Sequence, residues 1–246
     1  MNITRHIPNI LTLGNLFCGT VAAIFAVKGD FFATAFLVIL GILFDFLDGF
    51  AARMLKVQGE LGKQLDSLAD MVTSGVVPGI VMLQLLVIAI DKDAVGYFGV
   101  DAYGKSGSNL PYIGLLLTLA AGYRLAKFNI DERQSDSFIG VPTPAMSLFV
   151  IALPLIIEYT DYSFIIELIQ NKYFLIGVTL FFSVIMNAEI PLFSLKFKSF
   201  KLKDNLIKYI FLLLSVVLIV IIKVAAIPTI ILLYIIISLI QNMTNR

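Results

Sequence analysis

Long apolar runs recur along the whole chain, and they restrict its possible folds more than any other feature. They lie at about 9–28, from 31 into an acidic stretch that begins at 45, and at about 65–90, 110–128, 143–160, 172–190, 205–222 and 225–243. A helix needs about 20 apolar residues to cross the hydrocarbon core of a bilayer. Charged residues make up only 14% of the 246 residues, whereas soluble domains carry about 25%. The sequence therefore predicts an all-α membrane protein, a polytopic helical bundle of about eight transmembrane helices.

We expect residues 1–246 to form a single integral membrane domain, with core helices at about 9–190 and two extra C-terminal helices at about 205–243. If the N-terminus lies inside, the inner loops carry most of the cations, namely Arg5, Arg53, Lys56, Lys63, Arg124, Lys127, Arg133, Lys196, Lys198, Lys201, Lys203, Lys208 and Arg246. The outer turns then carry only Lys28, Lys92, Lys105, Lys172 and Lys223. The positive-inside rule therefore predicts that both termini are cytoplasmic and that the number of spans is even.

Four acidic residues stand out at the ends of the second and third predicted spans. The first stretch reads Asp45-Phe-Leu-Asp-Gly-Phe-Ala-Ala-Arg53, and the second, after eight more residues, reads Gly62-Lys-Gln-Leu-Asp-Ser-Leu-Ala-Asp70. Within each stretch the acids are three or four residues apart, so each pair points to one side of its helix. A tight turn around Gly59 and Gly62 would make the four carboxylates face one another. Such a cluster repels itself strongly unless cations are bound.

Three interpretations of this cluster differ in what they explain. Acids that cap a helix N-terminus account for Asp66 alone, because it lies near the start of its span. A cation site in a transporter usually lies near the bilayer midplane, whereas these acids lie at helix ends that the topology places on the cytoplasmic side. Two-metal chemistry on a pyrophosphate uses several carboxylates as ligands for Mg²⁺ or Mn²⁺. A zinc site is disfavoured because His6 and Cys18 are the single histidine and cysteine.

The pattern resembles the signature of the CDP-alcohol phosphatidyltransferase family. The residues that fall on the family's positions are Asp45, Asp48, Gly49, Ala52, Arg53, Gly62, Asp66 and Asp70. The resemblance implies two divalent ions, Mg²⁺ or Mn²⁺, with Asp45 and Asp66 on both, Asp48 on one and Asp70 on the other. It also implies that Asp70 takes the proton of the attacking hydroxyl, and that the CDP-lipid contacts Gly49, Ala52, Arg53 and Gly62. Gly49 permits close approach of the nucleotide, and Arg53 offers a fork of donors to phosphate oxygens.

Other segments are similar to those of phosphatidylserine synthases within this family. They are Pro8-Asn-Ile-Leu-Thr12, Asn15-Leu-Phe-Cys-Gly19, Arg124-Leu-Ala-Lys-Phe-Asn129 and Phe138-Ile-Gly-Val-Pro-Thr-Pro-Ala145. The small and polar residues Gly14, Asn15 and Gly19 favour either close helix contact or a wall beside a substrate. Arg124 and Lys127 could receive the carboxylate of serine, with Asn129 orienting the acceptor. The first two are equally well explained as positive-inside residues.

The expected function is therefore transfer of the phosphatidyl group from CDP-diacylglycerol to L-serine at the cytoplasmic membrane face, giving phosphatidylserine and CMP. The alternative within the family is a phosphatidylglycerophosphate synthase, which takes a phosphorylated acceptor. The alternative from another class is a cation-coupled transporter. We expect contacts with membrane lipids and no nucleic-acid partner, and the resemblance implies a homodimer.

Overall fold

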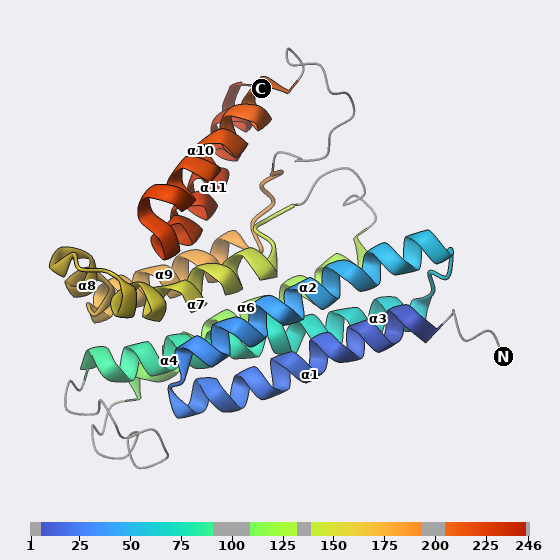
Figure 1. The fold of residues 1–246 in the computed structure, drawn as a ribbon, viewed down its shortest axis with the longest axis horizontal. Helices are drawn as coiled ribbons and strands as arrows, with labels where there is room; N and C mark the ends of the chain where they lie inside the picture. Colours follow the sequence, from blue (N-terminus) through green and yellow to red (C-terminus); the bar gives the residue numbers. More distant parts are fainter. Residues whose placement is uncertain (1–5, 91–108, 132–138, 193–204, 245–246) are drawn as a thin grey trace.

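The computed structural model describes residues 6–90, 109–131, 139–192 and 205–244. Within these ranges the chain is helical, apart from connecting segments and an isolated β-bridge between Ile139 and Pro191. The elements, shown in Figure 1, are α1 (Ile7–Lys28), α2 (Phe31–Leu55), α3 (Glu60–Asp70), the π-helical segment η2 (Met71–Val76), α4 (Val77–Ile90), the 3₁₀ turn η4 (Leu110–Leu115), α6 (Leu116–Ile130), α7 (Thr143–Tyr159), α8 (Ser163–Ile169), α9 (Lys172–Ile185), α10 (Leu206–Ile222), the 3₁₀ turn η7 (Lys223–Ala225) and α11 (Ala226–Thr244). The prediction of an all-α fold is confirmed for this part of the chain.

The first two helices form an antiparallel pair joined by a tight turn (Figure 1). Helix α1 ends at Lys28, and the next residue, Gly29, has a left-handed φ of 75° that suits glycine. The Asp30 side chain then accepts a hydrogen bond from the Ala33 N–H at 2.9 Å and caps the start of α2. The pair packs closely because small residues, among them Ala22, Ala26 and Ala35, are buried.

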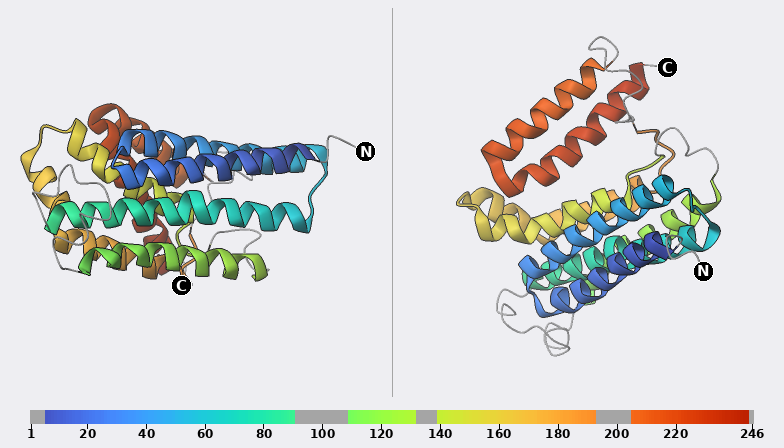
Figure 2. Two further views of the ribbon diagram at one scale, coloured as in Figure 1. Left: turned by 90° about the horizontal axis from the view of Figure 1, so that it is seen from below. Right: turned by 45° about the vertical axis from the view of Figure 1, so that its right-hand side comes forward.

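The stretch Glu60–Ile90 is one continuous helical segment that contains α3, η2 and α4. It lies between the α1–α2 pair and α6 (Figure 2, left). Its π-helical part is held by close contacts: a Cβ added to Gly19 would lie 2.9 Å from the Thr73 Cα, and one added to Gly41 would lie 2.8 Å from the Thr73 Cγ2. On the other side, the Thr118 hydroxyl donates a hydrogen bond to the Gly75 carbonyl at 3.0 Å. The segment that follows Asp70 is therefore fixed from two sides.

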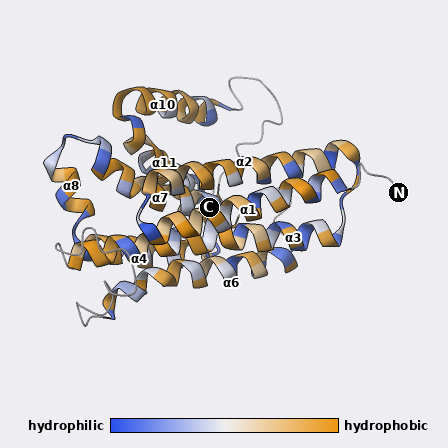
Figure 3. Ribbon diagram, turned by 60° about the horizontal axis from the view of Figure 1, so that its bottom comes forward, coloured by the Kyte–Doolittle hydropathy of each residue, from blue (hydrophilic) through white to orange (hydrophobic). Residues whose placement is uncertain are grey.

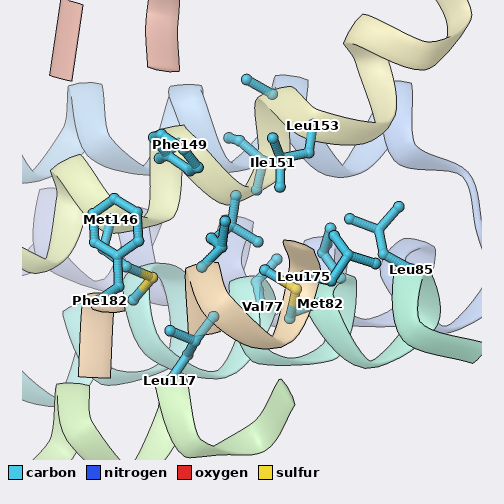
Figure 4. Close-up of a cluster of buried hydrophobic side chains, with 14 of the residues drawn as sticks. Val77, Met82, Leu85, Leu117, Met146, Phe149, Ile151, Leu153, Leu175 and Phe182 are labelled. Carbon is cyan, nitrogen blue, oxygen red and sulfur yellow. The ribbon is translucent and has the colours of Figure 1, made fainter. Parts of the chain in front are cut away.

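The main apolar core lies where α4, α6, α7 and α9 meet, as Figure 4 shows. Phe149 of α7 and Phe182 of α9 place their ring centroids 4.7 Å apart. The largest fully buried side chains include Phe182, Met82, Leu86, Leu117, Met146, Leu175 and Met186. This core holds α6 and the end of α9 against α4.

The last two helices form a hairpin that turns at Lys223 (Figure 1). The rings of Phe211 and Tyr234 lie 5.9 Å apart across the hairpin, and α11 contacts α7. Large exposed apolar side chains cover α10, including Leu213, Val220 and Ile221. Figure 3 shows hydrophobic colour over most helices, with hydrophilic stretches in α3 and at several turns. An apolar exterior of this kind suits contact with lipid.

The predicted eight spans are not confirmed. Among the described residues, four helical stretches are long and apolar enough to cross a membrane, namely Ile7–Lys28, Phe31–Leu55, Glu60–Ile90 and Leu206–Thr244, and the bent pair of α8 and α9 raises the number to five. The last of the four stretches is the α10–α11 hairpin, which turns at Lys223. The run predicted at 110–128 divides into a 3₁₀ turn and a 15-residue helix, and α7 has 17 residues. The chain is an integral membrane protein by its apolar helices, while eight spans and cytoplasmic termini remain predictions.

Candidate active site

The acidic residues lie on two consecutive helices that are joined by a short turn. Asp45 and Asp48 belong to α2, and Asp66 and Asp70 belong to α3. The chain leaves α2 through Lys56, which has a left-handed φ of 54°, and Gly59 precedes the first residue of α3. The chain therefore turns between the two acidic stretches, at Gly59, as predicted. The prediction that Gly62 lies in this turn is wrong, because α3 begins at Glu60 rather than near 65 and already includes it.

Three of the four carboxylates come together. Asp45, Asp48 and Asp66 each offer an oxygen atom, and these atoms lie within 4.8 Å of one another. Asp70, the last residue of α3, follows Asp66 by one helical turn. One oxygen of Asp66, Oδ1, is buried and has no hydrogen-bond partner among the described residues. Oxygen donors alone, gathered around an unpartnered carboxylate oxygen, fit a hard divalent cation such as Mg²⁺ or Mn²⁺.

Two polar residues of α1 hold the acids in place. The Thr12 hydroxyl donates a hydrogen bond to Asp48 Oδ2, and Asn15 Nδ2 donates one to Asp70 Oδ1 at 3.2 Å. Both side chains are buried, and residues three apart lie on one face of a helix. The sequence marked Asn15 as unusual but did not identify its partner. Thr12 lies three residues before Asn15 on the same apolar span, and this spacing of polar residues could have identified it from the sequence.

A cavity of about 630 Å³ opens beside the triad. The residues predicted to contact the CDP-lipid, Gly49, Ala52, Arg53 and Gly62, all line it, together with Asp48 and Asp66. The other lining residues are Pro8, Asn9, Thr12, Val57, Gln58, Gly59, Glu60, Lys63 and Phe128. This volume is typical of pockets that bind small molecules or cofactors.

Glycine has a specific role in the wall of this cavity. A Cβ on Gly49 would lie 3.4 Å from Arg53 Nη1, so the guanidinium lies over the bare backbone of the preceding helical turn. A Cβ on Gly62 would lie 3.4 Å from Asn9 Oδ1. Because neither glycine has a side chain, a ligand in the cavity could approach the helix backbone closely at both positions.

The three predicted acceptor residues do not form one group. Lys127 makes an ion pair with Glu189 at 3.3 Å. The Asn129 side chain exchanges hydrogen bonds with the Ser67 hydroxyl, and its backbone carbonyl accepts one from Lys63 Nζ at 2.6 Å. These contacts tie α6 to neighbouring segments. Arg124 is different, since it points into the protein and is only 6% exposed.

Comparison with known proteins identifies the chain's family. A sequence model described as CDP-alcohol phosphatidyltransferase matches residues 5–185. The chain belongs to the CDP-alcohol phosphatidyltransferase family. The part of this phosphatidyltransferase that matches the family model contains the carboxylate cluster, the cavity and Arg124, and it ends with the last residue of α9.

Several curated relatives of this phosphatidyltransferase carry names that specify a reaction. A CDP-diacylglycerol–serine O-phosphatidyltransferase of Bacillus subtilis is 32% identical over 153 residues, which are 61% of this chain and 75% of the relative. One of the same name from Helicobacter pylori is 31% identical over 214 residues, 84% of this chain and 78% of the relative. An archaetidylserine synthase of Methanothermobacter thermautotrophicus is 27% identical over 160 residues, 64% of this chain and 61% of the relative.

Proposed function

We propose that this protein transfers the phosphatidyl group of CDP-diacylglycerol to the hydroxyl of L-serine, giving phosphatidylserine and CMP. The observation that carries the proposal is the carboxylate triad, with its oxygens within 4.8 Å of one another, at the wall of the 630 Å³ cavity. The names of the relatives from Bacillus subtilis and Helicobacter pylori support serine as the acceptor.

The donor side of the reaction is assigned to the cavity. Asp45, Asp48 and Asp66, with Asp70 beside them, would hold divalent ions, which neutralise the charge of a pyrophosphate during in-line displacement. Arg53 would pair with phosphate oxygens through its guanidinium. Gly49, Ala52 and Gly62 would let the nucleotide lie close to the helix backbones.

Asp70 is assigned as the general base. Asn15 binds its Oδ1, which leaves the second oxygen for the proton of the serine hydroxyl. As this proton moves to Asp70, the hydroxyl oxygen forms a bond to the lipid-bearing phosphorus. The bond from this phosphorus to the bridging oxygen breaks, and CMP leaves with the electron pair. The proton then passes from Asp70 to solvent, which restores the base.

We also propose a cytoplasmic active site, because nucleotides are cytoplasmic and the cationic loops favour this orientation. The homodimer is proposed from family resemblance alone. Size-exclusion chromatography with light scattering tests it, and a monomer mass in detergent would count against it.

The test is CMP release by purified protein in detergent with CDP-diacylglycerol and Mg²⁺ or Mn²⁺. Serine, glycerol 3-phosphate and inositol 1-phosphate are supplied separately. Release with serine alone, abolished by EDTA and by Asp66→Asn, is expected. The matched control is Asp161→Asn, since Asp161 is an exposed acid between α7 and α8. Release with glycerol 3-phosphate alone would instead identify a phosphatidylglycerophosphate synthase, and failure to bind CDP-lipid would reopen the transporter interpretation.

A further inference from the structure

The Arg124 guanidinium is buried and forms no ion pair within the described part of the chain. Its side chain makes no ion pair and no hydrogen bond with any residue that the structure describes, and its Nε is buried and unpartnered. Its Cζ lies 5.9 Å from the centroid of the Phe128 ring. A charged group buried in this way is costly unless an anion neutralises it. The position therefore suits an anionic ligand.

An unpartnered acceptor lies near this unpartnered donor. Asn187, just after α9, has a buried Oδ1 without a partner among the described residues. Its Nδ2 donates to the carbonyls of Ala120 and Ser183 at 3.1 and 3.3 Å. Because the amide nitrogen has two carbonyl acceptors, the orientation of the amide group is fixed, and Oδ1 remains free to accept.

Arg124 and Asn187 line the same small niche, of about 10 Å³. Its other lining residues are Lys127, Ile139, Met186 and Ala188. The niche is closed by the segment before α7, where Gly140 N–H donates to the Ile190 carbonyl at 2.9 Å. Gly140 has a φ of 74°, and a Cβ there would lie 3.0 Å from the Met186 carbonyl carbon. Room for about one water admits a single ligand group, so the rest of a ligand bound there would extend out of the niche.

The helix that carries Arg124 packs against the segment that carries the proposed base. Helix α6 contacts both α3, which ends at Asp70, and the π-helical segment that follows it. A Cβ added to Gly75 of this segment would lie 3.2 Å from the Ala121 Cβ. A small molecule held at Arg124 could therefore direct its other end toward Asp70.

We propose that Arg124 and Asn187 form the subsite for the α-amino-acid end of the acceptor. Arg124 takes the carboxylate through charge-assisted hydrogen bonds, and Asn187 Oδ1 accepts a hydrogen bond from the α-ammonium group. The side-chain hydroxyl of the acceptor then extends toward Asp70. Lys127 also lines the niche, but its ammonium is paired with Glu189. Asn129 ties α6 to α3 through Ser67. This assignment rests on the proposed function.

The test compares acceptors that lack one charged group. Serinamide lacks the carboxylate, and 3-hydroxypropionate lacks the ammonium group. In the wild type, kcat/KM for serine should exceed that for either analogue. Arg124→Gln should lower kcat/KM for serine by about 10- to 100-fold and leave CMP release with serinamide unchanged. Asn187→Leu should bring serine down to the level of 3-hydroxypropionate.

Two further measurements keep the result interpretable. Arg124→Lys keeps the charge and should restore part of the serine activity, whereas Lys172→Gln, at the far end of α9, should leave it unchanged. Binding of radiolabelled serine should be competed by alanine, which keeps both charged groups, and not by serinamide. Equal losses with serine and serinamide in Arg124→Gln, or competition by serinamide as strong as by alanine, would overturn the subsite. Absence of CMP release from the wild type with every acceptor would overturn the proposed function itself.

Discussion

Replacing Asn15 with leucine separates the positioning of Asp70 from the stability of the fold. Asn15 is fully buried, and its Nδ2 donates to Asp70 Oδ1 at 3.2 Å. Its backbone carbonyl accepts a hydrogen bond from the Thr73 hydroxyl at 3.2 Å, which the substitution keeps. Its Oδ1 has no partner among the described residues and faces Gly41, where an added Cβ would lie 2.8 Å from it.

The expected magnitudes follow from these contacts. A hydrogen bond to a charged group contributes about 1.5–3 kcal/mol, and about 1.4 kcal/mol corresponds to a factor of ten in rate. Asn15→Leu should therefore lower kcat roughly 10- to 100-fold. The free energy of unfolding should change much less, because the substitution also removes a buried, unsatisfied acceptor of similar energetic cost. KM for CDP-diacylglycerol should stay the same, since Asn15 does not line the cavity.

The assay is the initial rate of CMP release as a function of serine and CDP-lipid, with thermal unfolding measured in parallel. A thiol-reactive fluorophore suits the unfolding measurement, because Cys18 is the single cysteine and is buried. Thr20→Val is the matched control on α1, since the bond that the Thr20 hydroxyl makes among the described residues stays within its own helix, to the Leu16 carbonyl at 2.8 Å. Wild-type kcat in Asn15→Leu would refute the positioning role. A fall in kcat that simply follows a large fall in Tm would refute it as well.

Three other predictions follow from the same geometry. Asp70→Asn should abolish CMP release while the protein still folds and binds Mn²⁺, detected by electron paramagnetic resonance; turnover near that of the wild type would exclude Asp70 as the base. Gly19→Ala should lower Tm, because its Cβ would lie 2.9 Å from the Thr73 Cα and such overpacking costs about 1–3 kcal/mol. Gly177→Ala is its control, because nothing lies within 4 Å of the added Cβ, and a Tm loss as large as that of Gly19→Ala would contradict the argument. Mg²⁺ should raise Tm by relieving repulsion in the carboxylate triad, by about 2.7 kcal/mol at 100 times its Kd, and the rise should shrink in Asp48→Asn; a Tm insensitive to Mg²⁺ and Mn²⁺ would argue against the metal site.

The acidic cluster was predictable because its spacing is local. Acids three and four residues apart share a helix face whatever the tertiary fold, and only one short turn separates the two helices. The partners of these acids were not predictable in the same way. Asn15 and Asp70 are 55 residues apart, and no periodicity in the sequence relates them. The π-helical segment after Asp70 also leaves no clear pattern, because it is held by tertiary contacts at Gly19, Gly41 and Gly75.

The number of spans is harder to predict from the sequence than the acidic cluster, for a physical reason. Hydropathy does not distinguish apolar residues that face lipid from those buried in protein. Within the strongly apolar part of Glu60–Ile90, 72% of the stretch is buried inside the protein. In the strongly apolar part of Leu206–Thr244, the buried share is 17%. The run at 172–190 likewise ends at Ile185 as a helix, and it joins α8 at an angle of 63°. The length and the bending of these helices are determined by packing against other helices, which cannot be read from hydropathy along the sequence.

The two sites proposed for the donor and the acceptor are built from different helices. The cavity assigned to the CDP-lipid is lined mainly by residues of α1, α2 and α3 and of the turn between α2 and α3. The niche at Arg124 is built from α6 and from the segments beside α7 and α9. Asp70, the proposed base, accepts a hydrogen bond from Asn15 of α1, and α6 packs against the π-helical segment that follows it. Residues around the acceptor could therefore change without disturbing the donor site. This separation would allow one metal site to serve different alcohols.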